Sequence, residues 1–181
     1  MGPEKNLFLL MRAFIRIAGQ VPDLHLVIIG SGPEEDHLRE MARLQGLTSR
    51  IHLVGHVPYD EVPNWLAMAD FFAFASVSES HPLSMLEALA AGLPVLAIPC
   101  PGVEDTIVDG HNGLFSPEAV DAFAVRMQRL ATDASLRARL AAGARETCAQ
   151  YDVRRTASVL LGHYERLVEE RARARAERRD E

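Results

Sequence analysis

The sequence predicts an α/β protein built on a Rossmann-like, doubly wound parallel sheet. Short apolar runs that are typical of buried strands alternate with segments of helical periodicity along most of the chain. The chain has 181 residues, 48% of them hydrophobic, and this is enough for one domain with a substantial core. A net charge of −6 is an ordinary balance for such a domain.

The first half of the chain alternates helix and strand. Residues 6–20 place apolar side chains on one helical face, and residues 24–29 form a continuous apolar run typical of a buried strand. A tight Gly-Ser-Gly-Pro turn then leads into a helix over residues 34–45, which Gly46 ends. Residues 51–55 form the second strand.

The same alternation continues further along the chain. A short helix over residues 60–68 precedes a strand at 71–75, and a helix over 82–91 precedes a strand at 94–98. Gly92 stops the second of these helices. The remaining expected elements are a helical turn at 103–108, a strand stub at 113–115 and helices at 117–131, 135–150 and 152–175.

The charge distribution excludes several classes of function. No Lys or Arg occurs between Ile51 and Val125, whereas ten Asp or Glu do, so nucleic-acid binding by this half is not expected. The tail at 165–181 holds six acids and six Arg, which favours a solvated helix over a basic membrane-binding one. No Cys/His cluster has metal-ligand spacing, and we expect no metal and no cofactor.

Features at the N-terminus and the two cysteines predict the compartment. No stretch approaches 18 uninterrupted apolar residues, and the first residues lack the layout of a signal peptide. Cys100 and Cys148 are far apart, which favours reduced thiols over a disulfide. We therefore expect a cytoplasmic protein, either free or peripheral at the cytoplasmic membrane face.

Two carboxylates stand out in the most apolar part of the sequence. Glu79 and Glu87 are the only charged residues between Phe71 and Val103. A carboxylate in such surroundings is costly unless it has a partner, and the hydroxyls of a sugar-like ligand are suitable donors. The simpler interpretation of Glu87 is an ordinary exposed helical glutamate.

The start of the helix at 82–91 can hold an anion. Pro82 suits the first helical position, and the backbone N–H groups of Leu83 and Ser84 would then be free to bind a phosphate. Lys5 is the only lysine of the chain. On composition alone it could equally be a solvated loop charge, and His81 an ordinary loop histidine.

A dinucleotide-binding site is not expected after the first strand. Gly30 and Gly32 begin a G-x-G-x-x-G pattern, but Glu35 occupies the place of the third glycine. No acid follows a strand at the spacing that a ribose contact in such a site would need. The pair of glycines is better interpreted as a turn that packs a strand against a helix.

Residues 78–95 resemble the E-x7-E motif of retaining glycosyltransferases of group 1 with the GT-B fold, which commonly reads S-E-G-F-G-x-x-x-L-E-A-M-A-x-G-x-P-V. Four further segments resemble family motifs in the same order. Residues 2–6 are similar to the end of G-R-x-x-x-E-K-G, 26–33 to L-x-I-x-G-x-G-P, 54–58 to F-x-G-x-V-P, and 109–114 to D-G-x-x-G-L. The resemblance extends from Gly2 to about Tyr164, and His81 and Pro82 depart from its usual Phe and Gly.

The resemblance implies a role for each candidate residue. Glu87 would bind the ribose hydroxyls of a nucleoside diphosphate sugar, and Glu79 would contact the donor sugar. Lys5 would bind the diphosphate and act with Glu79 in catalysis. His81 would contact a phosphate or the sugar of the nucleoside diphosphate sugar. Leu83 and Ser84 would bind the diphosphate through their backbone N–H groups. Val57 and its neighbours would border the nucleobase.

The resemblance also implies a division of the chain and a partner. Residues 1–150 would form the nucleotide-sugar-binding domain, and residues 151–181 a C-terminal helix with a charged tail. The first strand of the family's sheet, its diphosphate Arg and its N-terminal acceptor domain have no counterpart here. We therefore expect a gap flanked by residues 24–29 and 71–75, and a requirement for the N-terminal domain or another chain to complete the fold. Any membrane contact would be made by that domain.

The expected reaction is transfer of a sugar to an acceptor hydroxyl with retained configuration. We expect the chain alone to be inactive, because the acceptor half is not in it. Alternatives are a non-catalytic nucleotide-binding or interaction module of the same fold, and a sugar-nucleotide epimerase, which the E-x7-E spacing disfavours. The nucleobase, sugar, acceptor, oligomeric state and route to retention stay open.

Overall fold

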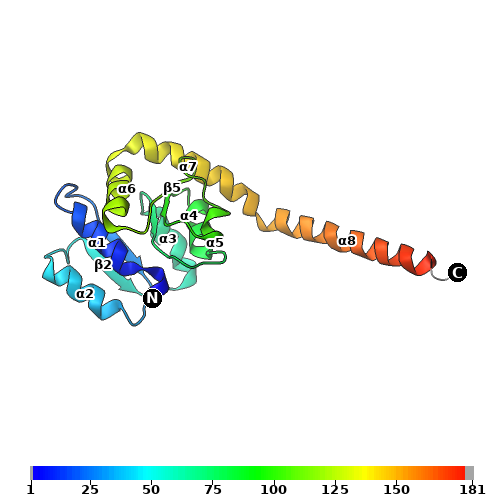
Figure 1. Ribbon diagram of the computed structural model, residues 1–181, viewed down its shortest axis with the longest axis horizontal. Coiled ribbons are helices and arrows are strands. Elements are labelled where there is room, and N and C mark those ends of the chain that lie inside the picture. The colour runs from blue at the N-terminus through cyan, green and yellow to red at the C-terminus, as the bar shows by residue number, and fades with distance from the viewer. Residues whose placement is uncertain (1, 178–181) are drawn as a thin grey trace. The chain divides into compact units, whose positions relative to one another are not determined.

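The computed structural model describes residues 2–177, and these form the predicted α/β fold with parallel strands (Figure 1). Each apolar run that predicts a strand contains one. The strands are β1 (Leu26–Ile29), β2 (Ile51–Gly55), β3 (Phe72–Phe74), β4 (Val95–Ala97) and β5 (Gly113–Phe115). They are up to two residues shorter than the predicted runs, because strand pairing ends before the apolar pattern does.

The helices also follow the prediction, with shifted ends. They are α1 (Leu7–Ile17), α2 (Glu35–Leu44), α3 (Val62–Ala67), α4 (Leu83–Ala90), α5 (Pro101–Glu104), α6 (Val120–Thr132), α7 (Ala134–Cys148) and α8 (Val153–Glu177), with short 3-10 turns η1 (Pro3–Lys5), η2 (Tyr59–Glu61) and η3 (Ala149–Tyr151). The turn predicted at 103–108 is wrong by two residues at its start: α5 begins at Pro101, after an extended Cys100.

The strands form two parallel sheets, which are not hydrogen-bonded to each other. One sheet has the order β1-β2, with Leu26 opposite Ile51, and the other has the order β3-β4-β5. Strands β1 and β3 are therefore edge strands, and no strand among residues 2–177 pairs with the free side of either. This arrangement agrees with a sheet that is interrupted between residues 24–29 and 71–75.

Part of the core lies between α1 and α6, which pack against each other although more than a hundred residues separate them (Figure 1). Met11 and Phe14 of α1 and Phe123 and Met127 of α6 are almost completely buried. Apolar side chains at helical spacing on both elements make this packing possible. The short turn η1, which carries Lys5, is thereby attached to a rigid helix.

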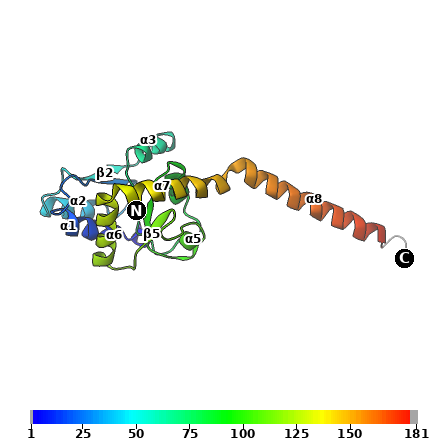
Figure 2. The ribbon, with the colours of Figure 1, turned by 90° about the horizontal axis from the view of Figure 1, so that it is seen from above.

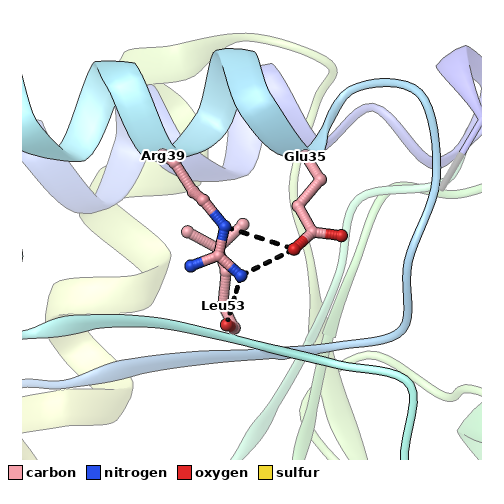
Figure 3. A network of polar contacts seen from close by, with 3 residues as sticks. All are labelled: Glu35, Arg39 and Leu53. Atoms are coloured by element: carbon pink, nitrogen blue, oxygen red, sulfur yellow. Dashed lines mark hydrogen bonds and ion pairs between the residues drawn. The ribbon is translucent and has the colours of Figure 1, made fainter.

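Helix α2 is tied to strand β2 by a side-chain network (Figure 3). The Arg39 guanidinium donates to the Glu35 carboxylate, at 2.6 Å from Nη2, and to the backbone carbonyl of Leu53 at 2.9 Å. A charged donor that reaches a strand carbonyl resists sliding of the helix along the sheet. The network thus restrains β2 at Leu53, four residues before Val57, which was predicted to border a nucleobase.

The chain divides into two compact units, Met1–Thr147 and Cys148–Glu181. Within the second unit α8 is a single long helix (Figure 2), as the pattern at 152–175 predicts. Most of the charged tail at 165–181 belongs to it, and residues 178–181 lie outside the described residues. None of the helices described here combines the length and the apolar character that spanning a membrane would require.

Candidate functional site

Lys5 and Glu79 form an ion pair across 74 positions of sequence. Lys5 Nζ lies 2.6 Å from Glu79 Oε1, and the side chains are 42% and 14% exposed. The sequence alone offers no cation near Glu79, so the structure supplies the partner that this carboxylate needs. Because Lys5 is the more exposed member, its ammonium group faces solvent as well as Glu79.

Backbone contacts hold the loop that carries Glu79 from two sides. The N–H of Val77 donates to the carbonyl of Glu4 at 3.2 Å, which links the loop to η1. On the other side the N–H of Gly102 in α5 donates to the carbonyl of Glu79 at 3.1 Å. The ion pair is therefore supported by hydrogen bonds at both of its ends.

Gly102 approaches this loop so closely that a side chain would not fit. A Cβ atom at Gly102 would overlap with the backbone carbonyl groups of Ser80 and Glu79. We expect Gly102→Ala to lower the free energy of unfolding by about 1–3 kcal/mol, because backbone atoms cannot give way as a side chain can. Urea unfolding followed by circular dichroism measures this change.

Gly19→Ala is the matched control for that substitution. No heavy atom lies within 4 Å of a Cβ built on Gly19, so this variant should keep its stability to within about 0.5 kcal/mol. If both variants were equally stable, the backbone around Gly102 would have to make room for a methyl group without lowering the free energy of unfolding.

Helix α4 begins next to the loop. Its first residue is Leu83, and the N-cap residue Pro82 makes no side-chain capping hydrogen bond. The expectation that Pro82 takes the first helical position is wrong by one residue: Pro82 is extended and precedes the helix as its N-cap. Leu83 and Ser84 are consequently the first two residues of the helix, where backbone N–H groups have no intrahelical partner.

Glu87 lies one turn further along α4, where it is half-buried. The Glu87 carboxylate raises the pKa of Tyr59 above its ordinary value, through hydrogen bonding and then through its negative charge. The tyrosine opens η2 and its side chain is 78% exposed. Sequence reasoning missed Tyr59, although it directly follows the predicted nucleobase segment.

Val57 and His81 complete the set of predicted residues. Val57 is half-buried in the connection between β2 and η2, directly after a turn at Gly55 with φ of +81°. His81 is exposed at the end of the loop that carries Glu79. Val57 follows the carboxyl end of β2 and His81 follows that of β3, and these strands belong to the two different sheets.

Two cavities of about 370 and 380 Å³ lie away from these residues. The first is lined by residues such as Gly92 and Arg137, and the second by residues such as Gln20 and Asp121. None of the predicted site residues lines either cavity. The candidate site is thus separate from both of these cavities.

Residues 1–147 match the family model described as "Glycosyl transferases group 1". The chain belongs to the group 1 glycosyltransferase family. A D-inositol 3-phosphate glycosyltransferase of Stackebrandtia nassauensis is 33% identical over 181 residues, which cover 94% of this chain and 41% of that protein. The domain therefore spans about two fifths of the length of this curated relative.

Solved structures of group 1 proteins share the fold of this domain. The C-terminal domain of LpcC from Francisella tularensis superposes with a TM-score of 0.77 at 25% identity, over 84% of this chain and 83% of that one. The pneumococcal O-GlcNAc transferase GtfA, solved in complex with UDP and GlcNAc, superposes with a TM-score of 0.80 at 26% identity, over 93% and 34% of the two chains. The chain thus corresponds to the C-terminal domain of a GT-B glycosyltransferase.

Proposed function

We propose that this domain binds the nucleoside diphosphate sugar of a retaining glycosyltransferase. The observation that carries the proposal is the ion pair between Lys5 of η1 and Glu79, which lies in the loop that leads into the N-terminus of α4. A cation and free backbone N–H groups together suit a diphosphate, and carboxylates suit sugar hydroxyls. The relative GtfA, whose structure contains UDP, supports a donor of this class.

Lys5 can bind a phosphate without releasing Glu79. An ammonium group has three N–H donors, and one of them is directed to Glu79 Oε1 in the structure. The other two remain for phosphate oxygens, because the Lys5 side chain is partly exposed. When the bond to the donor sugar breaks, negative charge grows on the departing diphosphate. Lys5 and the N–H groups of Leu83 and Ser84 would stabilise that charge and lower the barrier.

The two carboxylates would orient the donor at either end of the diphosphate. Glu79, held by Lys5, would accept hydrogen bonds from the sugar, and Glu87 from the ribose. His81 would reach the phosphate or the sugar from the loop, and Val57 would border the nucleobase. Transfer to an acceptor hydroxyl is proposed for a polypeptide that also supplies the acceptor site, because the curated relative is more than twice as long as this chain.

Calorimetric titration of the chain with UDP, GDP and ADP tests the proposal. We expect saturable binding of one of them, and Glu87→Ala should weaken it by about 1.5 kcal/mol, the scale of hydrogen bonds to a charged group. Glu146→Ala, which removes an exposed glutamate of α7, is the control and should bind as the wild type does. A folded chain that binds none of the three nucleotides would refute the proposal.

A further inference from the structure

We propose that His25 and His52 form a binding site for a divalent transition-metal ion of the Zn²⁺ and Cu²⁺ class. The two imidazole rings lie beside each other on the β1-β2 sheet. His25 Nδ1 is 3.0 Å from His52 Nε2, and the ring centroids are 5.4 Å apart with the ring planes 4° from parallel. The inference goes beyond the proposed function, because it involves neither the donor-binding residues nor a nucleotide.

Strand pairing brings the two histidines together. They are 27 residues apart, so their spacing in the sequence gives no sign of a shared site. His25 directly precedes β1, and His52 is the second residue of β2. Val27 is in register with His52, and His25 lies two residues before Val27, so these side chains are on the same face of the sheet. Hydrogen-bonded strands thus support both rings.

The face that carries the pair is open to solvent. His25 and His52 are exposed, whereas Leu26 and Ile51, on the opposite face, are buried. A dissolved ion can therefore reach both rings. The histidines lie near the amino ends of their strands, whereas Val57 follows the carboxyl end of β2, so the pair is separate from the predicted nucleobase segment.

The distance between the two nitrogen atoms suits coordination of a single ion. Zn²⁺ binds an imidazole nitrogen at about 2.0–2.1 Å, and two such bonds at an angle of about 90–110° place the nitrogens about 2.8–3.4 Å apart. The 3.0 Å between His25 Nδ1 and His52 Nε2 lies in this range. A small rotation of the exposed rings would direct both lone pairs at an ion beside the line that joins the nitrogens.

Metal binding would replace the hydrogen bond between the rings without a net loss of protons. A neutral imidazole carries one N–H, so one ring of the pair donates and the other accepts. The donor ring would take its other tautomer, in which the proton sits on the ring nitrogen that faces away from the partner. Both facing nitrogens would then offer a lone pair, and neutral imidazole is the commonest metal ligand among side chains.

The chemistry of the pair selects the class of ion. Imidazole suits Zn²⁺ and Cu²⁺, whereas Mg²⁺ and Ca²⁺ prefer oxygen ligands. Among the described residues there is no group of three or more His, Cys, Asp or Glu side chains that could hold a metal ion, so water would complete the coordination. The ion would join the edge strand β1 to β2 and would favour the folded chain.

Calorimetric titration of the full chain with Zn²⁺ alone tests the proposal. The wild type should bind Zn²⁺ saturably, and His25→Gln and His52→Gln should each weaken the binding by at least about tenfold, because a single imidazole cannot chelate the ion. His37→Gln, which removes an exposed histidine of α2, is the matched control and should bind as the wild type does. Mg²⁺ should not compete with Zn²⁺.

Two further measurements report on the geometry of the site. Zn²⁺ at about 100 times its Kd should raise the urea midpoint of the wild type by about 1 M, and should raise it much less in His25→Gln and His52→Gln. The electron paramagnetic resonance spectrum of the wild type with Cu²⁺ should show coupling to two imidazole nitrogens. This readout needs no variant, so it holds even where a substitution impairs folding.

Three outcomes would overturn the proposal. They are a wild type that binds no Zn²⁺, equal binding by all three glutamine variants, and a copper spectrum with fewer than two coupled nitrogens. The two rings would then be only a stacked, hydrogen-bonded pair between neighbouring strands. Because these measurements contain no nucleotide, failure of this inference is distinguishable from failure of the proposed function.

Discussion

Replacing Asn112 with leucine should lower the free energy of unfolding by about 3–4 kcal/mol, because it removes three hydrogen bonds from a closed site. The asparagine is fully buried. Its amide donates to the carbonyl of Thr106 and to the hydroxyl of Thr147, both at 2.9 Å, and its Oδ1 accepts the N–H of Val108 at 2.8 Å. Leucine has a similar volume but fills the site without any polar group.

Urea unfolding of the wild type and Asn112→Leu measures this loss. Asn64→Leu is the control, since Asn64 is exposed on α3, and we expect it to change stability by less than about 0.5 kcal/mol. The slope of free energy against urea should be similar in all three proteins. A loss below about 1 kcal/mol for Asn112→Leu would mean that the neighbouring backbone finds other partners.

Lys5→Gln should weaken the binding of UDP by about 100-fold, or about 2.7 kcal/mol, near the upper end for a hydrogen bond between charged groups. Two effects add in the same direction. The variant loses the only lysine of the chain, and it leaves the Glu79 carboxylate, 14% exposed, without its cation. A diphosphate would then meet an uncompensated negative charge in place of a positive one.

Comparing UDP with uridine shows whether the loss of affinity in Lys5→Gln arises from contacts with the diphosphate. Binding of uridine, which has no phosphate, should change by less than about threefold in the same variant. Lys5→Gln combined with Glu79→Gln should recover part of the affinity for UDP, because the repulsive charge is gone. Arg16→Gln breaks an exposed ion pair of α1 with Asp121 and serves as the control. If UDP and uridine lost affinity equally, Lys5 would have no specific role at the diphosphate.

Much of the fold can be predicted from local pattern. A run such as 94–98, apolar throughout and preceded by a glycine that ends a helix, has few ways to be satisfied except as a buried strand. The five predicted strands all form, and the order of helices between them is correct. Such predictions succeed because burial of apolar side chains at a fixed period is a property of each segment by itself.

Element ends and close approaches were harder to predict. The helix expected at 6–20 ends at Ile17, where carbonyl groups near its end accept hydrogen bonds from the guanidinium of Arg50. The need for glycine at position 102 depends on where the loop at Ser80 lies. Both effects involve partners that are more than twenty residues away in sequence, and no local pattern records them.

For this protein the sequence by itself determined the α/β class, the order of the elements and, through motifs at 2–6 and 78–95, the membership of a family. Tertiary structure alone decided which side chains meet. Lys5 reaches Glu79 only because η1 is placed next to the loop that carries this carboxylate, and Asn112 reaches Thr147 only because its loop packs against α7. Apolar periodicity acts within a segment, whereas a hydrogen bond between distant residues requires the packing of all the segments between them.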